Sequence, residues 1–272
     1  MTRIMTAILA IGLVASLWAA PAYAAELTAV GLQDTAAADT ATTAPETPAT
    51  PTNASVYVLT KIGDMKCTYN SKGLITKRAN ASRTVTFKYS GTNIKSYTSV
   101  FSHGRSYSKT TGKFTYKKGQ LTKLVEKGSN GTATDSYTYN KAGRVSKYTH
   151  SAAGKAKVKY KCTYDANGRL QTRNASGGDK TKESFAYDAK GNLSSVTHAY
   201  GSGGYTQEYA NKYKTKRLVK RIATLTSLKS WATTTKYTYK KISVPAQYAQ
   251  AVADQQWALL NPQVSFSYPL NY

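Results

Sequence analysis

The chain has 272 residues, of which 38 are lysine or arginine and 13 are aspartate or glutamate, giving a formal net charge of +25. Once Arg3 and the four acids near the N-terminus are set aside, residues 55–272 carry 37 basic and 9 acidic side chains, a net charge of +28. This balance excludes the mixed surface charge that soluble domains normally have. Attraction to polyanions therefore explains the charge better than simple solubilisation.

The first 24 residues have the parts of a secretory signal peptide. Arg3 supplies a positive charge, residues 4–20 are mostly apolar, and Ala22-Tyr23-Ala24 has the A-x-A pattern of a cleavage site. An uncleaved membrane anchor is the alternative, because this apolar run is close to the shortest that spans a bilayer. No cysteine stands at the cleavage point, so a lipoprotein is not expected. We expect a secreted, extracellular protein with no membrane span after cleavage, free or held non-covalently at the cell wall.

Residues 25–54 are rich in Ala, Thr and Pro and contain no lysine or arginine. They have too little apolar bulk to offset the entropy lost on ordering, which predicts a disordered linker. Such a linker has the reach to cross a cell wall. A processed remnant is the alternative.

Residues 155–173 show the pattern on which the next domain, residues 55–244, is built. Lysine occupies every odd position from Lys155 to Lys161, and Ala, Val, Tyr or Cys occupies the even ones. A period of two predicts a strand with one packed and one wet face. Asp165-Ala166-Asn167-Gly168 then predicts a type I turn with a bulge at glycine. In this register Tyr164 lies opposite Leu170, Cys162 opposite Thr172, and Lys161 opposite Arg173.

The hairpin recurs along the chain. An aliphatic residue follows each of seven tyrosines by five or six positions, and an eighth tyrosine continues the series. The spacing is 20 to 27 residues and averages about 24. The tyrosines are Tyr69, Tyr89, Tyr116, Tyr139, Tyr164, Tyr187, Tyr213 and Tyr239. A fixed period of this length indicates a repeat protein whose unit holds two strands and two turns.

The segment YDANGRL, residues 164–170, resembles the core of the YD repeat of RHS-type and some Gram-positive wall-associated bacterial proteins. YDAKGNL at residues 187–193 is close to it, and YNKAGRV at residues 139–145 is one step further away. The resemblance covers roughly residues 65–239 and implies a β-hairpin repeat exported to the cell surface. Large RHS proteins wind many more repeats into a shell around a toxin. That role is not expected here, because no toxin domain follows these repeats.

Eight units imply about sixteen strands, and open twisted sheets rarely exceed about ten without curling. We therefore predict an all-β antiparallel meander that is rolled or strongly coiled, with its tyrosine side inward.

In residues 245–272 the hydrophobic pattern changes from a period of two to a helical period. Pro245 to Leu260 predict a helix that closes the open end or mouth of the sheet and so removes an exposed edge, and residues 264–268 predict a last strand.

Catalytic chemistry is not visible in the sequence. The histidines are His103, His150 and His198, and the last two lie eleven residues after their unit's tyrosine, which favours a role in the repeat over a unique site. No paired carboxylates, metal-spaced cluster, cofactor motif or nucleophile motif is present. Cys67 and Cys162 share one repeat position, and we expect two unpaired, packed cysteines, although a closed sheet would let them pair.

These features predict a binding module for an anionic polymer: a wall polymer, an acidic polysaccharide or extracellular nucleic acid. The residues expected to bind it are Lys155, Lys157, Lys159, Lys161, Arg169 and Arg173. The alternative is a structural component of a surface assembly that contacts protein through sheet edges or the C-terminal helix. A wall-glycan hydrolase is a third hypothesis, which the absence of a catalytic constellation weakens.

Overall fold

The computed structural model describes residues 52–177, 180–201, 203–226 and 228–266. The predicted signal peptide, most of the predicted linker and residues 267–272 of the tail lie outside these ranges. The described residues form sixteen strands and one α-helix. The strands are β1 Asn53–Ile62, β2 Met65–Tyr69, β3 Ile75–Ala79, β4 Arg83–Ser90, β5 Asn93–His103, β6 Ser106–Lys117, β7 Gln120–Gly128, β8 Gly131–Tyr139, β9 Val145–Ala152, β10 Val158–Tyr164, β11 Leu170–Ser176, β12 Thr181–Tyr187, β13 Leu193–Tyr200, β14 Gly203–Lys214, β15 Arg217–Leu225 and β16 Leu228–Pro245.

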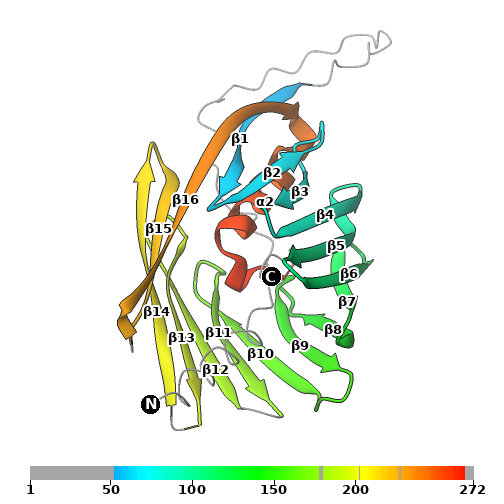
Figure 1. Ribbon diagram of the computed structural model, residues 1–272, viewed down its shortest axis with the longest axis vertical. Coiled ribbons are helices and arrows are strands. Elements are labelled where there is room, and N and C mark those ends of the chain that lie inside the picture. The colour runs from blue at the N-terminus through cyan, green and yellow to red at the C-terminus, as the bar shows by residue number, and fades with distance from the viewer. Residues whose placement is uncertain (1–51, 178–179, 202, 227, 267–272) are drawn as a thin grey trace, which may run out of the picture.

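Every strand pairs antiparallel with its neighbours in the chain, and β1 also pairs with β16 (Figure 1). The sheet therefore closes into a barrel. This confirms the prediction of an all-β, rolled antiparallel meander of sixteen strands. The first strand begins at Asn53, opposite Pro245, so the last two residues of the predicted linker belong to the sheet.

A bulge beside each repeat tyrosine sets the register of the hairpins. Tyr164 lies opposite Leu170 as predicted, but Thr163 lies opposite Thr172, so one residue of β11 has no partner. Cys162 therefore lies opposite Arg173 and Lys161 opposite Asn174, and the predicted pairing of Lys161 with Arg173 is wrong. The prediction placed one bulge at Gly168 and missed this second one. Because side chains alternate between faces, one extra residue moves Arg173 from the outer to the inner face.

The same break in register occurs at the tyrosine of every hairpin from β2–β3 to β14–β15. It also occurs where the barrel closes. Tyr239 of β16 lies opposite Leu59 of β1, with the register shift between Leu59 and Lys61. The eighth unit is thus a hairpin without a turn, assembled from the last and first strands of the domain.

The tyrosine hydroxyl groups connect each unit to the one before it. The Tyr164 hydroxyl donates a hydrogen bond of 2.7 Å to the carbonyl oxygen of Val145, the aliphatic residue of the preceding unit. Five more tyrosines make the equivalent bond at 2.6–2.8 Å: Tyr69, Tyr89, Tyr139, Tyr187 and Tyr239. At least six of the eight repeat tyrosines therefore satisfy a carbonyl of the neighbouring unit, which explains a preference for tyrosine over phenylalanine.

The hairpin turns follow the predicted chemistry. At the turn after Tyr164, Asp165 accepts a 2.8 Å hydrogen bond from the Arg169 backbone N–H, and Gly168 has a φ of +77°. Glycine adopts this left-handed conformation at no steric cost. Where the aliphatic residue follows five positions after the tyrosine, the two residues pair directly and the strands are joined by two residues.

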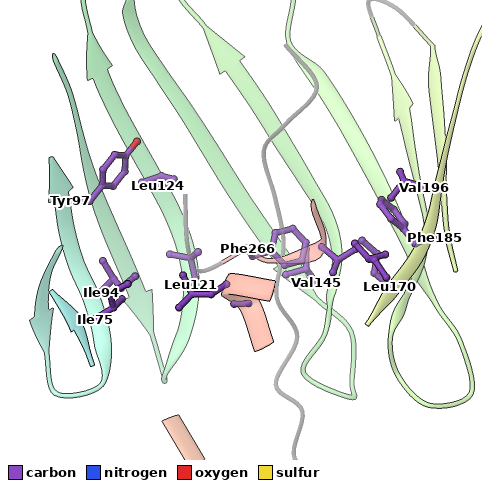
Figure 2. Close-up of a cluster of buried hydrophobic side chains, with 14 of the residues drawn as sticks. Ile75, Ile94, Tyr97, Leu121, Leu124, Val145, Leu170, Phe185, Val196 and Phe266 are labelled. Atoms are coloured by element: carbon purple, nitrogen blue, oxygen red, sulfur yellow. The ribbon is translucent and has the colours of Figure 1, made fainter. Parts of the chain in front are cut away.

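The inner face of the wall carries the core. The aliphatic repeat residues form one row across alternate strands of the wall (Figure 2): Ile75, Ile94, Leu121, Val145 and Leu170. Phe266 lies among them and packs edge-on against the rings of Tyr137 and Tyr148. The predicted strand at residues 264–268 does not form in its described part, because Val264 ends a short 3-10 turn, Pro262–Val264.

The predicted C-terminal helix is present as a 3-10 turn, Ala246–Tyr248, followed by α2, Ala249–Leu260. Figure 1 shows α2, in red, between the two sides of the wall. The Gln255 side-chain oxygen accepts a 2.8 Å hydrogen bond from the Ile75 backbone N–H, and Gln256 does the same for Leu59 at 2.7 Å. The helix therefore packs inside the barrel, at the end that carries the tyrosine hairpins. The edge that we expected the helix to cover is instead removed by the pairing of β1 with β16.

No helix among the described residues has both the length and the apolar character needed to cross a membrane.

Candidate functional site

Only two of the four lysines predicted to lie along one strand are in that strand. β10 begins at Val158, so Lys155 and Lys157 lie in the loop before it, and Lys159 and Lys161 lie on its outer face. All four side chains are exposed. The structure therefore keeps them on the same stretch of surface but not along one continuous strand.

Lysines also line up across the strands of the outer wall. Lys161 of β10 lies directly opposite Lys147 of β9. On the other side of β10, Lys161 lies opposite Asn174 of β11, and Asn174 lies opposite Lys182 of β12. We call Lys147, Lys161 and Lys182 the first lysine row. A second lysine row consists of Lys212, Lys220 and Lys236, which are directly opposite one another on β14, β15 and β16. Like charges in direct opposition cost stability, so both rows oppose folding unless an anion binds there.

The two predicted arginines do not join these rows. The Arg169 Nε atom donates to Asp165 Oδ2 at 2.7 Å, and its guanidinium lies over the Tyr187 ring at 4.8 Å. Arg173 is buried, with 3% of its surface exposed, and forms an ion pair with Glu183. The prediction that Arg173 contributes to an outer anion-binding face is wrong, because the bulge beside Tyr164 turns it inward.

The acidic side chains lie mostly away from the outer wall. Of the eight acids in the described part of the domain, three are buried inside the barrel: Glu126, Asp135 and Glu183. Asp165 and Asp188 accept hydrogen bonds within hairpin turns. The exposed acids are Asp64, Glu208 and Asp254. No lysine of the described residues is buried, whereas three of the eight acids lie inside the barrel, so the outer wall is strongly basic. The sequence alone did not reveal this distribution.

Two of the buried acids pair with the repeat histidines. Asp135 Oδ1 lies 2.9 Å from His150 Nδ1, and Glu183 Oε1 lies 3.1 Å from His198 Nδ1. Both pairs are cross-strand neighbours at one repeat position, as the equal spacing of the two histidines from their tyrosines suggested. A catalytic dyad needs one unique pair, so the duplication favours a structural role.

The surroundings give the two acids opposite titration behaviour. Burial raises the pKa of Asp135 to about 6, although its hydrogen bond to His150 acts in the other direction. Burial alone would also raise the pKa of Glu183, but the Arg173 guanidinium and the hydrogen bonds from His198 and Arg173 lower it to about 2. The pKa of His150 is raised by its hydrogen bond to Asp135.

The remaining sequence candidates do not form a reactive centre. Cys67 and Cys162 are unpaired, which confirms the expectation of free, packed cysteines. Burial raises the pKa of both thiols, that of Cys162 to about 12, so neither is activated as a nucleophile. Within the described ranges, no group of three or more His, Cys, Asp or Glu side chains has the spacing to hold a metal ion.

The architecture defines the chain as a closed barrel of repeated β-hairpins. The family model for the RHS repeat matches residues 164–202, which span the two units of Tyr164 and Tyr187. The chain therefore contains RHS-type repeats, as the YD motifs indicated, and an RHS repeat points to a structural rather than a catalytic role. No match was found among curated proteins.

Solved structures with low similarity include two porin-like proteins and the complex TcdB2-TccC3-Cdc42. A porin-like protein from Bacteroides vulgatus has a TM-score of 0.49 and 13% identity over 67% of this chain and 98% of that chain. A porin-like protein from Bacteroides uniformis has a TM-score of 0.39 and 12% identity, with the same two coverages. The complex TcdB2-TccC3-Cdc42 has a TM-score of 0.25 and 11% identity over 68% of this chain and 14% of that chain.

Proposed function

We propose that this protein is a structural component of the bacterial cell surface that is held in place by an anionic polymer bound to its outer wall. The RHS repeat and the closed barrel support the structural part of the proposal. The basic outer wall supports the polymer, because the lysine rows face outward and the three buried acids do not pair with them. The proposal includes secretion through the N-terminal signal peptide.

An extended polyanion fits this surface better than a compact ligand. The outer wall presents lysines around the barrel instead of in one pocket, and each bound anionic group would displace a counterion. Wall polymers, acidic polysaccharides and extracellular nucleic acid share this chemistry. Binding to any of them should weaken steeply with salt.

A protein partner is the second candidate. The edges of the sheet are paired with each other, so a partner cannot extend the barrel by adding a strand. It would have to contact the outer wall or the exposed face of α2, where Gln250, Ala253 and Asp254 lie. Such a contact should persist at a salt concentration that abolishes polymer binding.

The experiment compares two triple variants of the full chain. One changes Lys147, Lys161 and Lys182 to Gln, and the other changes the second lysine row, Lys212, Lys220 and Lys236, to Gln. Both should fold, since these residues lie on the outer wall. Binding to duplex DNA and to purified cell wall, with or without its anionic polymer, is titrated at several salt concentrations. Each variant should reduce the slope of log affinity against log salt by up to about 2.7, or about 0.9 per lost contact.

The outcomes separate the candidates. A loss in either variant, and a loss on walls stripped of anionic polymer, supports polymer binding. Unchanged binding by both variants, or equal binding to stripped walls, would contradict it and favour a protein partner. If only one variant loses affinity, that row is the site of attachment.

A further inference from the structure

Three arginines occupy one repeat position inside the barrel. Arg78, Arg173 and Arg221 each lie three residues after the buried aliphatic residue of their unit. Their cross-strand partners differ. Arg173 lies opposite Glu183, which neutralises it, whereas Arg78 lies opposite Val85.

Arg221 lies opposite Thr235, so it also lacks the carboxylate found opposite Arg173. Only 5% of its surface is exposed. Its Nε atom donates to Asn211 Oδ1 at 2.8 Å and its Nη1 atom to the Leu260 carbonyl at 2.6 Å. Its Nη2 atom donates to Asn261 Oδ1 at 3.3 Å, and the guanidinium lies 5.0 Å from the centre of the Tyr209 ring. All of these partners are neutral. In the described part of the chain, no carboxylate lies within 4.0 Å of the Arg221 guanidinium.

Arg78, like Arg221, has no carboxylate partner among the described residues. Its Nε atom is buried and has no hydrogen-bond partner among the described residues, and none of their carboxylates pairs with it. Burial lowers the pKa of Arg78, which reflects the cost of holding its charge away from water. Buried charges in proteins are normally paired, because an uncompensated one is expensive.

Both arginines line the same cavity on the inner side of the barrel, which has a volume of about 230 Å³ and is partly open to solvent. The wall of the cavity combines polar and apolar groups, including Gln207, Tyr209, Tyr237, Leu259 and Gln263. The Gln263 Oε1 atom is buried without a partner among the described residues. Among the described residues, the cavity is therefore lined by two arginines without a carboxylate partner, by an amide oxygen without a hydrogen-bond partner and by aromatic surface.

We infer that this cavity binds a small organic oxyanion, with Arg78 and Arg221 as its counterions. The anionic group, a carboxylate or a phosphate, would take the place that Glu183 takes beside Arg173. The rest of the ligand would be apolar or cyclic, to pack on Tyr209, Tyr237 and Leu259. This ligand differs from the outer-wall polymer in size and in position.

The first test uses the full chain and small probes. Thermal melts are recorded with phosphate, phenyl phosphate, acetate and benzoate, and with chloride at equal ionic strength as the control. A probe at about one hundred times its Kd should raise Tm by about 5 °C or more. The phosphate and carboxylate arms identify the anionic group, and the ring-bearing arms test the apolar part. If no probe raises Tm above the chloride control, the inference is wrong.

The second test supplies the missing carboxylate from the chain itself. Thr235→Glu places an acid opposite Arg221, as Glu183 is opposite Arg173, and should reduce probe affinity at least tenfold. Thr235→Gln is the matched control, of the same size but uncharged, and should keep most of the affinity. Val85→Glu is the equivalent change opposite Arg78. Equal affinity in wild type, Thr235→Glu and Val85→Glu would overturn the assignment.

The Gln variant of the second lysine row distinguishes this site from the proposed function. It should lose affinity for the polymer and bind the small probe as wild type does. A loss of probe binding in that variant would place the anion on the outer wall and would contradict an internal site. Melting curves of all variants without ligand establish that each one is folded.

Discussion

Changing Glu183 to Gln should remove the carboxylate that forms an ion pair with the buried Arg173 guanidinium. Both residues are almost inaccessible, at 4% and 3% exposure, and their ion pair lies in the inner layer of the barrel. Gln keeps the size and one oxygen of the side chain but removes its charge. The variant therefore separates the electrostatic contribution of the Glu183 carboxylate, including its contact with His198, from its packing.

Two independent estimates of the stability lost in Glu183→Gln agree. The pKa of Glu183 falls from 4.5 to about 2, and each pKa unit corresponds to about 1.4 kcal/mol, so the native environment favours the carboxylate by about 3 kcal/mol. Removing one partner of a buried ion pair typically costs about 3–5 kcal/mol. For a domain of this size, about 3 kcal/mol corresponds to a Tm decrease of about 6–12 °C.

The pH dependence provides a second signature. Because the folded-state pKa is lowered, the carboxylate contributes stability that is present above its ordinary pKa of 4.5 and is lost as pH falls through about 2. Thermal melts followed by circular dichroism at pH 7, 4 and 2 test this. The gap between wild type and Glu183→Gln should be full at pH 7 and absent at pH 2 or below.

Two control variants test whether the ion pair causes the loss of stability. Glu208→Gln removes an exposed acid and should change stability by less than about 0.5 kcal/mol. Replacing Arg173 and Glu183 together by Met and Leu should recover much of the loss, since apolar residues can replace a buried pair. Equal Tm values for wild type and Glu183→Gln at pH 7, or a gap that persists at pH 2, would refute a stabilising ion pair.

Three further predictions concern the repeat unit. Tyr164→Phe removes the hydroxyl that donates to the Val145 carbonyl and should cost about 1 kcal/mol in urea denaturation. Gly168→Val forces a β-branched residue into a φ of +77° and should cost about 1–2 kcal/mol, measured by thermal melting. The pKa of Asp135 is raised by burial and that of His150 by Asp135, so both groups add stability as pH falls from about 7 to 5. Asp135→Asn should flatten this rise in a pH series of melts.

Each of these has a matched control. Tyr107, with 66% exposure, should tolerate Phe without measurable loss, and Ala166 in the same turn as Gly168 should tolerate Val better. A Tyr164→Phe variant as stable as wild type would mean that the ladder of hydroxyl groups adds no stability. An unchanged melt for Gly168→Val would contradict the turn geometry. If wild type and Asp135→Asn gain stability equally towards pH 5, another group causes the rise.

The sequence predicted the repeat because its main determinants are local. The alternation around Lys159, the Asp165–Gly168 turn and the aliphatic residue after each tyrosine all act within about ten residues of one another. The number of strands and the inward tyrosine face follow from these patterns. The rolled shape follows because a flat sheet of that width is not stable.

The remaining features depend on contacts that the pattern does not contain. The bulge beside Tyr164 is not marked by a glycine, so the inward turn of Arg173 could not be read from spacing. Leu59 completes the unit of Tyr239 from the other end of the domain and belongs to no local motif. Gln255 and Gln256 look like surface residues of α2, but their amides satisfy backbone groups of the barrel.

The hairpin made from β16 and β1 also affects how the domain folds. Leu59 and Tyr239 are separated by 180 positions, so closure is the most non-local contact of the sheet and must wait for the last strand to emerge. Until then the growing meander has an unpaired strand at each end, and each is a template for association with other chains. A protein with this architecture needs protection until the barrel closes, and its assembly is completed in one late step.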